Sequence, residues 1–430
     1  MTQDTLKTGS IDKFQINGNF GGSVDLSGGI VDFRLYESVL SNTVTATATV
    51  VETGNVRDGK SVGTVDGLPI RGGEKTSIKM RDALGSPLHL DVLVNRVRNA
   101  SPESTRDLYL LDFASPEYFA NDTSRVSERY EGKISENVKK ILQEKLLTTK
   151  LLDIDETLLP YNFMGNDRKP FYTCTWLAQK SLPSNLPEGK GAAGFLFYQT
   201  IYSFKFKSID NLLSQKPVRK FIYNAGDRGR FDDIIINYTI DRDIDLHENL
   251  TLGTYNSNGL FFDPVSFRYL NANYTPEGLK GTSSPKKTKT VTSLLSGELT
   301  GESQDKSPSR MITAILDTGA MPSGKSSEKQ LEDWNNNPTT PNYNAENSLL
   351  QSIMRYNQLF TVQTTITIPG DFTIRAGDTV ECEFPQLESS KNTEKNRASS
   401  GIYMVAHVCH KITPENTLTS LSLVRDSFGK

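Results

Sequence analysis

Two related stretches decide the fold: Ile70-Arg71-Gly72-Gly73-Glu74 and, much later in the chain, Ile374-Arg375-Ala376-Gly377-Asp378. Each is followed by a segment that alternates apolar and polar residues, 75–80 in the first copy and 379–384 in the second. In both copies the glycine suits a turn or bulge between two strands, and the acidic residue suits the edge of that turn. One copy indicates an ordinary hairpin, whereas two copies indicate a duplicated β unit, and pseudo-twofold subunits of this kind tend to build rings.

The match extends to both sides of the motif. Upstream, residues 43–51 and 361–368 alternate in the manner of half-buried strands. One face of each strand is apolar, with Val44, Ala46, Ala48 and Val50 in the first and Val362, Ile366 and Ile368 in the second. Downstream, Val94, Val97 and a strand around Leu108 and Leu110 are answered by Val405, Val408 and a strand around Leu421 and Leu423.

The composition is that of a soluble protein with large polar loops, with 36% hydrophobic and 23% charged residues among 430. No apolar run approaches the roughly 18 residues of a membrane span, and residues 1–10 lack the regions of a signal peptide. The formal net charge of −3 does not favour a surface that grips nucleic acid. Cys174, Cys382 and Cys409 are expected to be free, buried thiols in a reducing compartment.

Four regions follow from the change of pattern along the chain. Residues 1–115 carry the first β unit, and 116–225 form an α/β middle domain. The second β unit takes 226–256 and 345–430, and a loop-rich insertion covers 257–344, with long loops at 276–301 and 321–344. The expected class is α+β, mainly β.

Helical spacing appears in the middle domain and again before the second unit. A helix capped by Ser135 is expected around residues 134–146, with others after Pro170 and near Ser208 and a strand pair at 194–207 between them. Residues 234–236 are an Ile-Ile-Ile run that is expected to be buried. An amphipathic helix at 349–360 leads into the second unit.

Residues 319–326 fit the phosphate-loop pattern G-x-x-x-x-G-K-[ST], which ends here in Gly324, Lys325 and Ser326. In that interpretation Lys325 contacts phosphate oxygens and Ser326 binds magnesium. However, Asn335-Asn336-Asn337-Pro338 stops the helix that must follow, and no later apolar strand ends in a metal-binding Asp. A P-loop nucleotidase is kept as the alternative from a different functional class.

Two other patterns suggest chemistry but do not complete a site. Asp317-Thr318-Gly319 resembles the catalytic loop of aspartic proteases, but the chain has one copy where a dyad needs two. His407, Cys409 and His410, with Cys382, suggest a zinc cluster, but strand alternation sends His410 to the side opposite the other two. We therefore expect no enzyme, no cofactor and no metal.

A series of segments in a defined order resembles the baseplate hub proteins of contractile-tailed, myovirus-type bacteriophages. These proteins are related to the hub part of secretion-system spike proteins. The segments cover nearly the whole chain: 68–74, 125–127, 130–142, 169–171, 176–177, 194–197, 204–210, 355–357, 368–371, 401–403 and 424–426.

The resemblance implies that both β units are tube-type β-barrels, with the α/β domain inserted between them. It implies a homotrimer whose six barrels surround a channel, so that a threefold object matches a sixfold tail tube and a threefold spike. Expected partners are the central spike protein, tail tube or tube-initiator proteins and surrounding wedge proteins. DNA is expected to pass through the channel without specific binding, and no part of this chain is expected to enter a membrane. The expected location is the tail baseplate of the virion, assembled in the host cytoplasm. A hub of a phage-derived injection or secretion device is the alternative within this class.

The polar face of the repeated strand differs in charge between the copies. It carries Lys75 and Lys79 in the first and Glu381 and Glu383 in the second. We hypothesise that alternation of these charges around a ring favours contacts between unlike copies.

Overall fold

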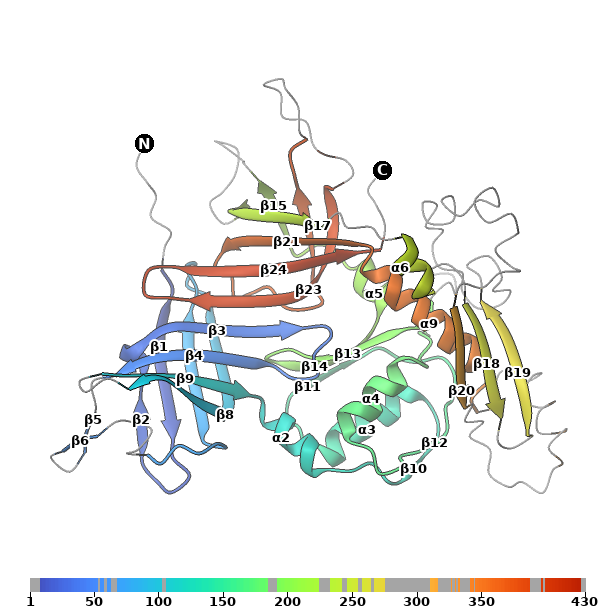
Figure 1. The fold of residues 1–430 in the computed structure, drawn as a ribbon, viewed down its shortest axis with the longest axis horizontal. Coiled ribbons are helices and arrows are strands. Elements are labelled where there is room, and N and C mark those ends of the chain that lie inside the picture. Colours follow the sequence, from blue (N-terminus) through green and yellow to red (C-terminus); the bar gives the residue numbers. More distant parts are fainter. Residues whose placement is uncertain are drawn as a thin grey trace.

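The structure is a computed structural model that describes residues 8–52, 55–57, 60–62, 68–102, 106–184, 192–223, 233–241, 246–253, 257–263, 267–274, 310–315, 326, 329, 332, 341–343, 345–386, 396 and 399–426. These residues are mainly β, with short helices gathered beside one part of the sheet (Figure 1). Within the described ranges, no helix combines the length and the apolar character that a membrane crossing requires.

Seven strands from the N-terminal part of the chain form what we call the first strand set. They pair in the order β2-β1-β7-β8-β9-β4-β3. Their bounds are β1 Ser10–Asn17, β2 Ser23–Asp25, β3 Ile30–Ser38, β4 Thr45–Glu52, β7 Lys75–Arg81, β8 Pro87–Pro102 and β9 Asp107–Ala114. The short helix η1, Ser27–Gly29, links β2 to β3, and β5, Asn55–Arg57, pairs with β6, Lys60–Val62, outside the set.

Seven strands from later in the chain form the second strand set. Their bounds are β15 Arg219–Tyr223, β16 Ile234–Ile235, β17 Asn237–Asp241, β21 Val362–Pro369, β22 Thr379–Glu383, β23 Gly401–Ile412 and β24 Thr417–Arg425. They pair in the order β16-β15-β22-β23-β24-β21-β17, which matches the first set strand for strand. Two pairings differ in direction, because β15 is parallel to both β22 and β16, whereas β1 is antiparallel to both β7 and β2.

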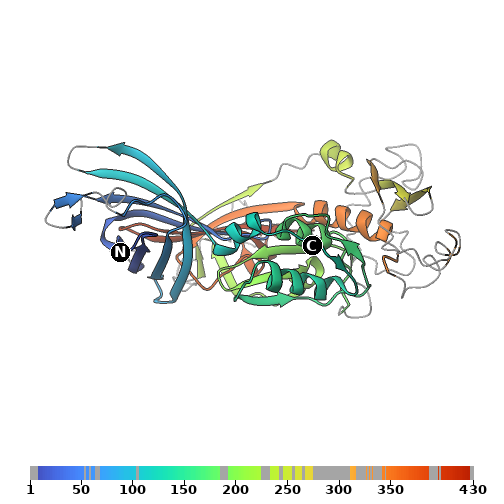
Figure 2. The same cartoon turned by 90° about the horizontal axis from the view of Figure 1, so that it is seen from below.

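The two sets are joined edge to edge into one sheet of fourteen strands. The junction is the antiparallel pairing of β3 with β23, from Ser38 opposite His407 to Phe33 opposite Ile412. Figures 1 and 2 show these strands side by side, with the first set extending away from the helices. Each set packs its apolar side chains into a core of its own.

A β-bulge occurs at the same place in both sets. The register shifts between Val94 and Arg96 in β8, and between Val405 and His407 in β23. The extra residue explains why the matching valines are spaced by three rather than by two, as in Val94 and Val97. The duplication therefore includes irregular features of the strands as well as their order.

Between the two sets in the sequence is a region of helices and short strands around a third core, which we call the α/β region. Its helices are α2 Pro116–Thr123, α3 Ile134–Lys145, α4 Pro170–Ala178 and α5 Ile209–Ser214. Its strands are β10 Arg129–Tyr130, β11 Leu151–Ile154, β12 Phe163–Met164, β13 Phe195–Gln199 and β14 Ser203–Ser208. The order β11-β14-β13 makes a three-stranded sheet, and β10 pairs with β12. The predicted helices and strand pair are present.

The capping prediction is wrong. Helix α3 begins at Ile134 with Lys133 as its N-cap and has no side-chain cap. Ser135 is buried inside the first turn, where its backbone N–H donates to Thr157 Oγ1 at 3.1 Å. A tertiary contact has taken the place of the local cap.

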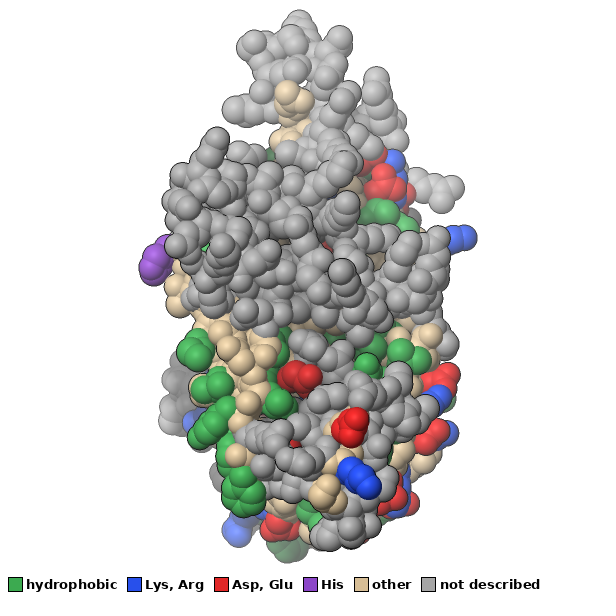
Figure 3. All heavy atoms as spheres, turned by 90° about the vertical axis from the view of Figure 1, so that its right-hand side faces the viewer, with side chains coloured by type: hydrophobic (Ala, Val, Ile, Leu, Met, Phe, Trp, Pro, Cys, Tyr) green, Lys and Arg blue, Asp and Glu red, His purple; other side chains and the backbone are tan. Residues whose placement is uncertain are grey.

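The remaining elements lie beyond the α/β region, at one end of the molecule (Figure 1). They are α6 Leu246–Thr251, β18 Ser257–Asp263, β19 Arg268–Tyr274, β20 Arg310–Ile315 and α9 Ala345–Leu359. Strands in the order β19-β18-β20 form a small sheet within the range that we expected to be loop-rich. Its Phe261 shares the third core with Leu350 and Met354 of α9. Hydrophobic side chains are also visible on the surface of this end (Figure 3).

Two predicted faces need correction. Of the run 234–236 only Ile235 is buried, whereas Ile236 is 41% exposed because it lies in the connection between β16 and β17. In β9 the inward residues are Tyr109, Leu111 and Phe113 rather than Leu108 and Leu110. The pairing makes Leu111 and Phe113 the counterparts of Leu421 and Leu423.

Candidate functional site at the seam between the strand sets

The repeated motif forms the same turn in both sets. In the first copy Gly73 N–H donates to Val94 O at 2.7 Å, and Val94 N–H donates to Glu74 O at 3.0 Å. The second copy has the same two bonds, both 2.8 Å long, among Gly377, Val405 and Asp378. The two glycines have φ of +84° and +89°, a conformation that favours glycine.

The acidic residue closes the first turn completely. Glu74 is buried, and its carboxylate accepts the backbone N–H of Arg71 and that of Gly72, each at 2.9 Å. Both N–H groups of the turn are thereby satisfied within the motif. Arg71 itself is exposed.

The second turn is closed only in part, because Asp378 is one methylene shorter than Glu74. Asp378 Oδ2 accepts the N–H of Arg375 at 2.8 Å. The N–H of Ala376 donates instead to Glu37 Oε2 at 3.2 Å. Glu37 lies in β3, so this bond crosses from the first strand set to the second.

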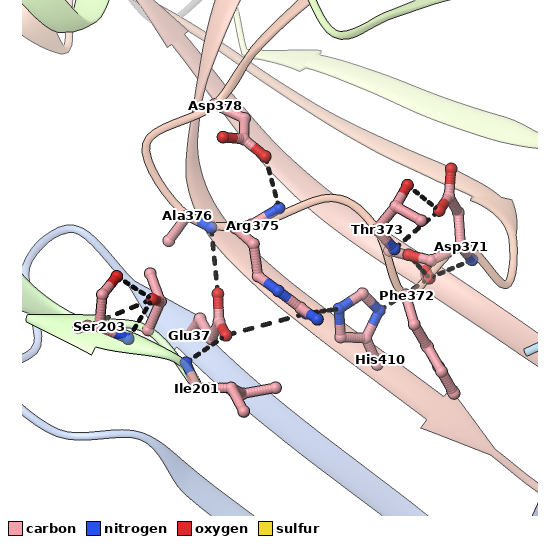
Figure 4. A network of polar contacts seen from close by, with 12 residues as sticks. Glu37, Ile201, Ser203, Asp371, Phe372, Thr373, Arg375, Ala376, Asp378 and His410 are labelled. Carbon is pink, nitrogen blue, oxygen red and sulfur yellow. Dashed lines mark hydrogen bonds and ion pairs between the residues drawn. The ribbon is translucent and has the colours of Figure 1, made fainter. Parts of the chain in front are cut away.

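Glu37 is a buried carboxylate that three parts of the chain share. Its Oε1 accepts the N–H of Ile201 at 2.9 Å, from the α/β region, and lies 3.9 Å from the guanidinium of Arg375 (Figure 4). Burial raises the pKa of Glu37, while Arg375 and the two N–H donors oppose that rise. The donors compensate the cost of removing this carboxyl group from water.

Arg375 connects Glu37 to a buried histidine. Its Nη1 lies 3.3 Å from His410 Nε2, and its guanidinium stacks over the ring of Tyr202 at 5.1 Å. His410 Nδ1 lies 3.0 Å from Thr419 Oγ1. Because arginine only donates, Nε2 accepts and Nδ1 carries the proton. Burial, assisted by Arg375, lowers the pKa of His410 to about 3, so the ring is neutral at physiological pH.

A second contact crosses the seam, by which we mean the junction between the two strand sets. Asp82, in the turn between β7 and β8, accepts the N–H of Phe372 at 2.9 Å. The neighbouring Asp371 carboxylate lies 3.2 Å from the guanidinium of Arg219 in β15. The segment 371–378 therefore bonds to both strand sets and, through Glu37, to the α/β region.

A polar cavity of about 370 Å³ lies between the α/β region and the second turn. Its charged side chains pair with one another, as in Lys205 with Asp153 at 2.5 Å and Lys207 with Asp155 at 2.9 Å. Tyr198 closes one side so tightly that a Cβ atom on Gly377 would lie 1.9 Å from its hydroxyl. A ligand in this cavity would have to compete with internal ion pairs, and we infer a structural role for it.

The residues of the charge hypothesis lie on the strands where they were expected. Lys75 and Lys79 are exposed on β7, and Glu381 and Glu383 are half-buried on β22. The glutamates also have a cation within the chain, because Lys220 of β15 lies 3.6 Å from Glu381 and 2.6 Å from Glu383. The sequence did not indicate this partner.

The residues of the rejected zinc site lie as strand alternation predicted. His407 is exposed, Cys409 is intermediate and His410 is buried. The described part of the chain contains no cluster of potential metal ligands. The aspartic-protease segment at 317–319 and the phosphate loop, apart from the exposed Ser326, lie outside the described residues.

Sequence reasoning missed Glu37, the centre of the seam. A signal was present, because Phe33, Leu35, Glu37 and Val39 share one face of an alternating strand. A carboxylate on an apolar face indicates a buried group with specific partners. Its partners could not be identified because they lie far away in the sequence.

Comparison with solved structures places the fold among phage tail proteins. A tail protein from Neisseria meningitidis MC58 has a TM-score of 0.56 at 11% identity, over 97% of each chain. The 43 kDa tail protein of prophage MuSo2 from Shewanella oneidensis has a TM-score of 0.51 at 8% identity, over 96% of this chain and 98% of that one. No family model matches the sequence, and no curated protein matches it. The predicted resemblance to phage tail proteins is confirmed at the level of the fold.

Proposed function

We propose that this protein is the structural hub of a contractile phage tail baseplate. In this proposal a homotrimeric ring of near-sixfold symmetry joins the tail tube to a central trimeric spike and leaves a channel for DNA. The observation that carries it is the strand order, which occurs twice in one chain with the same bulge and the same turn. A subunit with two equivalent halves offers six similar units when three copies assemble.

The pairing supports a barrel for each strand set. In the first set the two end strands are β2, which pairs with β1, and β3, which pairs with β4. The short helix η1 connects these two end strands directly. In the second, β16 pairs with β15 and β17 pairs with β21 in the same way. A short connection between the two end strands brings them close together, as a tube-type barrel requires.

These pairings also suggest revised domain limits. We assign 10–114 to the first barrel, and 219–241 with 362–425 to the second. The α/β domain then takes 115–218, because β15 belongs with the second barrel. The small sheet of β18 to β20 and α9 form an addition on the outside of the second barrel.

The proposed partners are a central spike protein, tail tube or tube-initiator proteins and surrounding wedge proteins, and the proposed location is the virion baseplate. The role is non-enzymatic. The charged groups of the seam are bonded within the chain, as in Glu37 with the N–H of Ile201 and Arg375 with His410. A hub of a phage-derived injection device would use the same architecture, and a P-loop nucleotidase remains the alternative of a different class.

The proposal is tested by the mass and shape of the purified protein. Light scattering is expected to give the mass of three chains, and electron microscopy a ring with a central hole. Addition of ATP and magnesium is expected to change neither result. Nucleotide binding that is lost in Lys325→Ala, from a protein of single-chain mass, would instead establish the nucleotidase.

A further inference from the structure

The junction between the strand sets identifies the surface that a second copy of the chain would occupy. Inside the chain, β3 of the first set pairs with residues 407–412 of β23, the half of that strand that does not pair with β22. The counterpart of β3 in the second set is β17, and the counterpart of β23 in the first set is β8. If the copies follow one another around a ring, the same contact must occur once more, between chains.

Among the described residues, both strands have an edge without a strand partner at the corresponding place. In β8, residues up to Leu93 pair with β7, and among the described residues that side of the strand has no strand partner beyond the bulge. The equivalent part of β23, beyond its own bulge, pairs with β3. Likewise, β17 pairs with β21 and, within the described ranges, with no other strand. Such edges are templates for pairing with another chain.

We propose that β17 of one chain pairs antiparallel with β8 of the next chain, from Arg98 towards the C-terminal end of β8, head to tail, and so closes the ring. This inference rests on the proposed trimer and specifies its interface. The register is fixed by equivalence, since Tyr36 lies opposite Cys409 inside the chain. The counterparts of these two residues are Asp241 and Arg98.

The equivalence follows from the pairings within each set. Tyr36 lies opposite Thr45 in β4, and Asp241 lies opposite Gln363 in β21. Thr45 and Gln363 correspond because they pair with Ala114 and Val424, the residues that follow Phe113 and Leu423. Arg98 and Cys409 each lie two residues beyond the bulge.

Charge is complementary at the pair that this register brings together. Arg98 is 43% exposed and already bonded to Asp112 at 2.6 Å, and Asp241 is exposed on β17. Docking places the Arg98 guanidinium between two carboxylates. Opposite charges directly across antiparallel strands stabilise the pairing and select its register.

Burial indicates the same surface. Val97 in β8 is only partly buried, whereas its counterpart Val408 at the internal seam is 1% exposed. Tyr238 and Ile240 in β17 are also partly buried, whereas their counterparts Phe33 and Leu35 are fully buried. Contact with a neighbouring chain would bury Val97, Tyr238 and Ile240 in the same way as the seam buries their counterparts.

The seam is not copied in every detail. The position that follows Asp241 carries Arg242 where the first set has Glu37. The first turn does not need that acceptor, because Glu74 already satisfies the N–H groups of both Arg71 and Gly72. Because Glu74 closes the first turn by itself, the proposed interface between chains does not require a glutamate at the position equivalent to Glu37.

Disulfide trapping tests the register. The variant Arg98→Cys with Asp241→Cys is made in a Cys409→Ser background, since Cys174 and Cys382 are buried. Directly opposed residues have Cα atoms about 4.5 to 5.5 Å apart, within disulfide range. Mild oxidation is expected to link up to three chains and no more. The off-register pair Arg96→Cys with Asp241→Cys is expected to link far less.

A mixing experiment tests the head-to-tail arrangement. Each single-cysteine variant alone is expected to remain unlinked, while an equal mixture is expected to give two-chain products. A trimeric mass without any disulfide would overturn the strand pairing and leave the proposed function intact. A protein that stays monomeric before and after oxidation would overturn both, and a disulfide in either single variant would overturn the head-to-tail order.

Discussion

A single methylene group decides how each copy of the turn is used. Glu74 reaches both N–H groups of its own turn, so the first copy is closed without help. Asp378 reaches one, and the N–H of Ala376 is left for Glu37 across the seam. The pair of near-identical motifs therefore has one self-contained member and one that binds a neighbouring strand set.

The two turn glycines provide a matched pair of substitutions. Both have positive φ, so either Gly→Ala change costs about 1 to 2 kcal/mol in backbone conformation. At Gly377 the new Cβ would also meet Tyr198 Oη at 1.9 Å, whereas at Gly73 its nearest contact is Asn19 at 3.9 Å. Urea unfolding is expected to show a loss of about 3 kcal/mol or more for Gly377→Ala, including the clash, and about half of that for Gly73→Ala. Equal losses would contradict the tight packing of Tyr198 on the turn.

His410 is expected to make stability sensitive to mild acid. Its pKa falls from 6.5 to about 3 in the folded protein, so the unfolded chain binds more protons between these values. The contribution is complete above pH 6.5 and is lost as the pH falls towards 3, with a maximum on the order of 5 kcal/mol. Unfolding midpoints measured from pH 7.5 to 4 are expected to fall less steeply in His410→Gln than in the parent.

Two comparisons isolate that effect. Glu37, whose pKa burial raises, contributes with the opposite sign, because stability falls as it ionises. The difference between parent and His410→Gln, rather than either curve alone, therefore reports on the histidine. The exposed His89 supplies the control, and a His89→Gln curve that departs from the parent as much as His410→Gln does would refute the assignment to His410.

At the scale of elements, the sequence predicted four strands of each set, β4, β7, β8 and β9 with their counterparts. They share alternation, turn chemistry and a bulge, all of which are local. The other three strands of each set were not recognised as repeats. Only their place in the strand order relates them. Strand β1 is antiparallel to its neighbour β7, whereas its counterpart β15 is parallel to its neighbour β22.

The seam was beyond prediction for a different reason. Glu37 meets Ile201 and Ala376 only after three parts of the chain have packed. Local patterns report which face of a strand is buried, and here they marked Glu37 as anomalous. They carry no information about which distant donors satisfy the carboxylate.

Charge reversal on β22 tests the hypothesis of unlike charges. Glu381→Lys with Glu383→Lys is expected to weaken assembly if these side chains face Lys75 and Lys79 of a neighbouring chain. The stability of the chain is expected to change little, because half-exposed pairs contribute about 1 kcal/mol or less. Light scattering at several concentrations measures the shift towards single chains.

Lys220 complicates that result and also supplies its control. Reversal places like charges around Lys220, which normally pairs with both glutamates. Adding Lys220→Glu restores opposite charges within the chain while leaving the neighbour's lysines unmatched. Assembly that recovers in the triple variant would show that the effect arose inside the subunit, and the hypothesis would fail.

At the scale of the whole molecule, the internal seam makes the two strand sets one continuous sheet rather than two tethered domains. The relation between the sets is therefore fixed by backbone pairing and by the Glu37 network. A ring of alternating copies needs a fixed orientation between the two strand sets, because a change of angle at each seam would prevent the ring from closing. The α/β region bonds to this seam through the N–H of Ile201, which donates to Glu37.

The symmetry of a ring image is the last prediction, and it follows from this construction. Three chains with two matching strand sets each should give an inner wall whose density repeats with a strong sixfold component. The α/β region occurs once per chain, so the outer rim should repeat with a threefold component. Averaged end-on electron micrographs, analysed by rotational harmonics at inner and outer radii, separate the two. An inner wall with threefold density and no sixfold component would show that the strand sets are not equivalent around the channel.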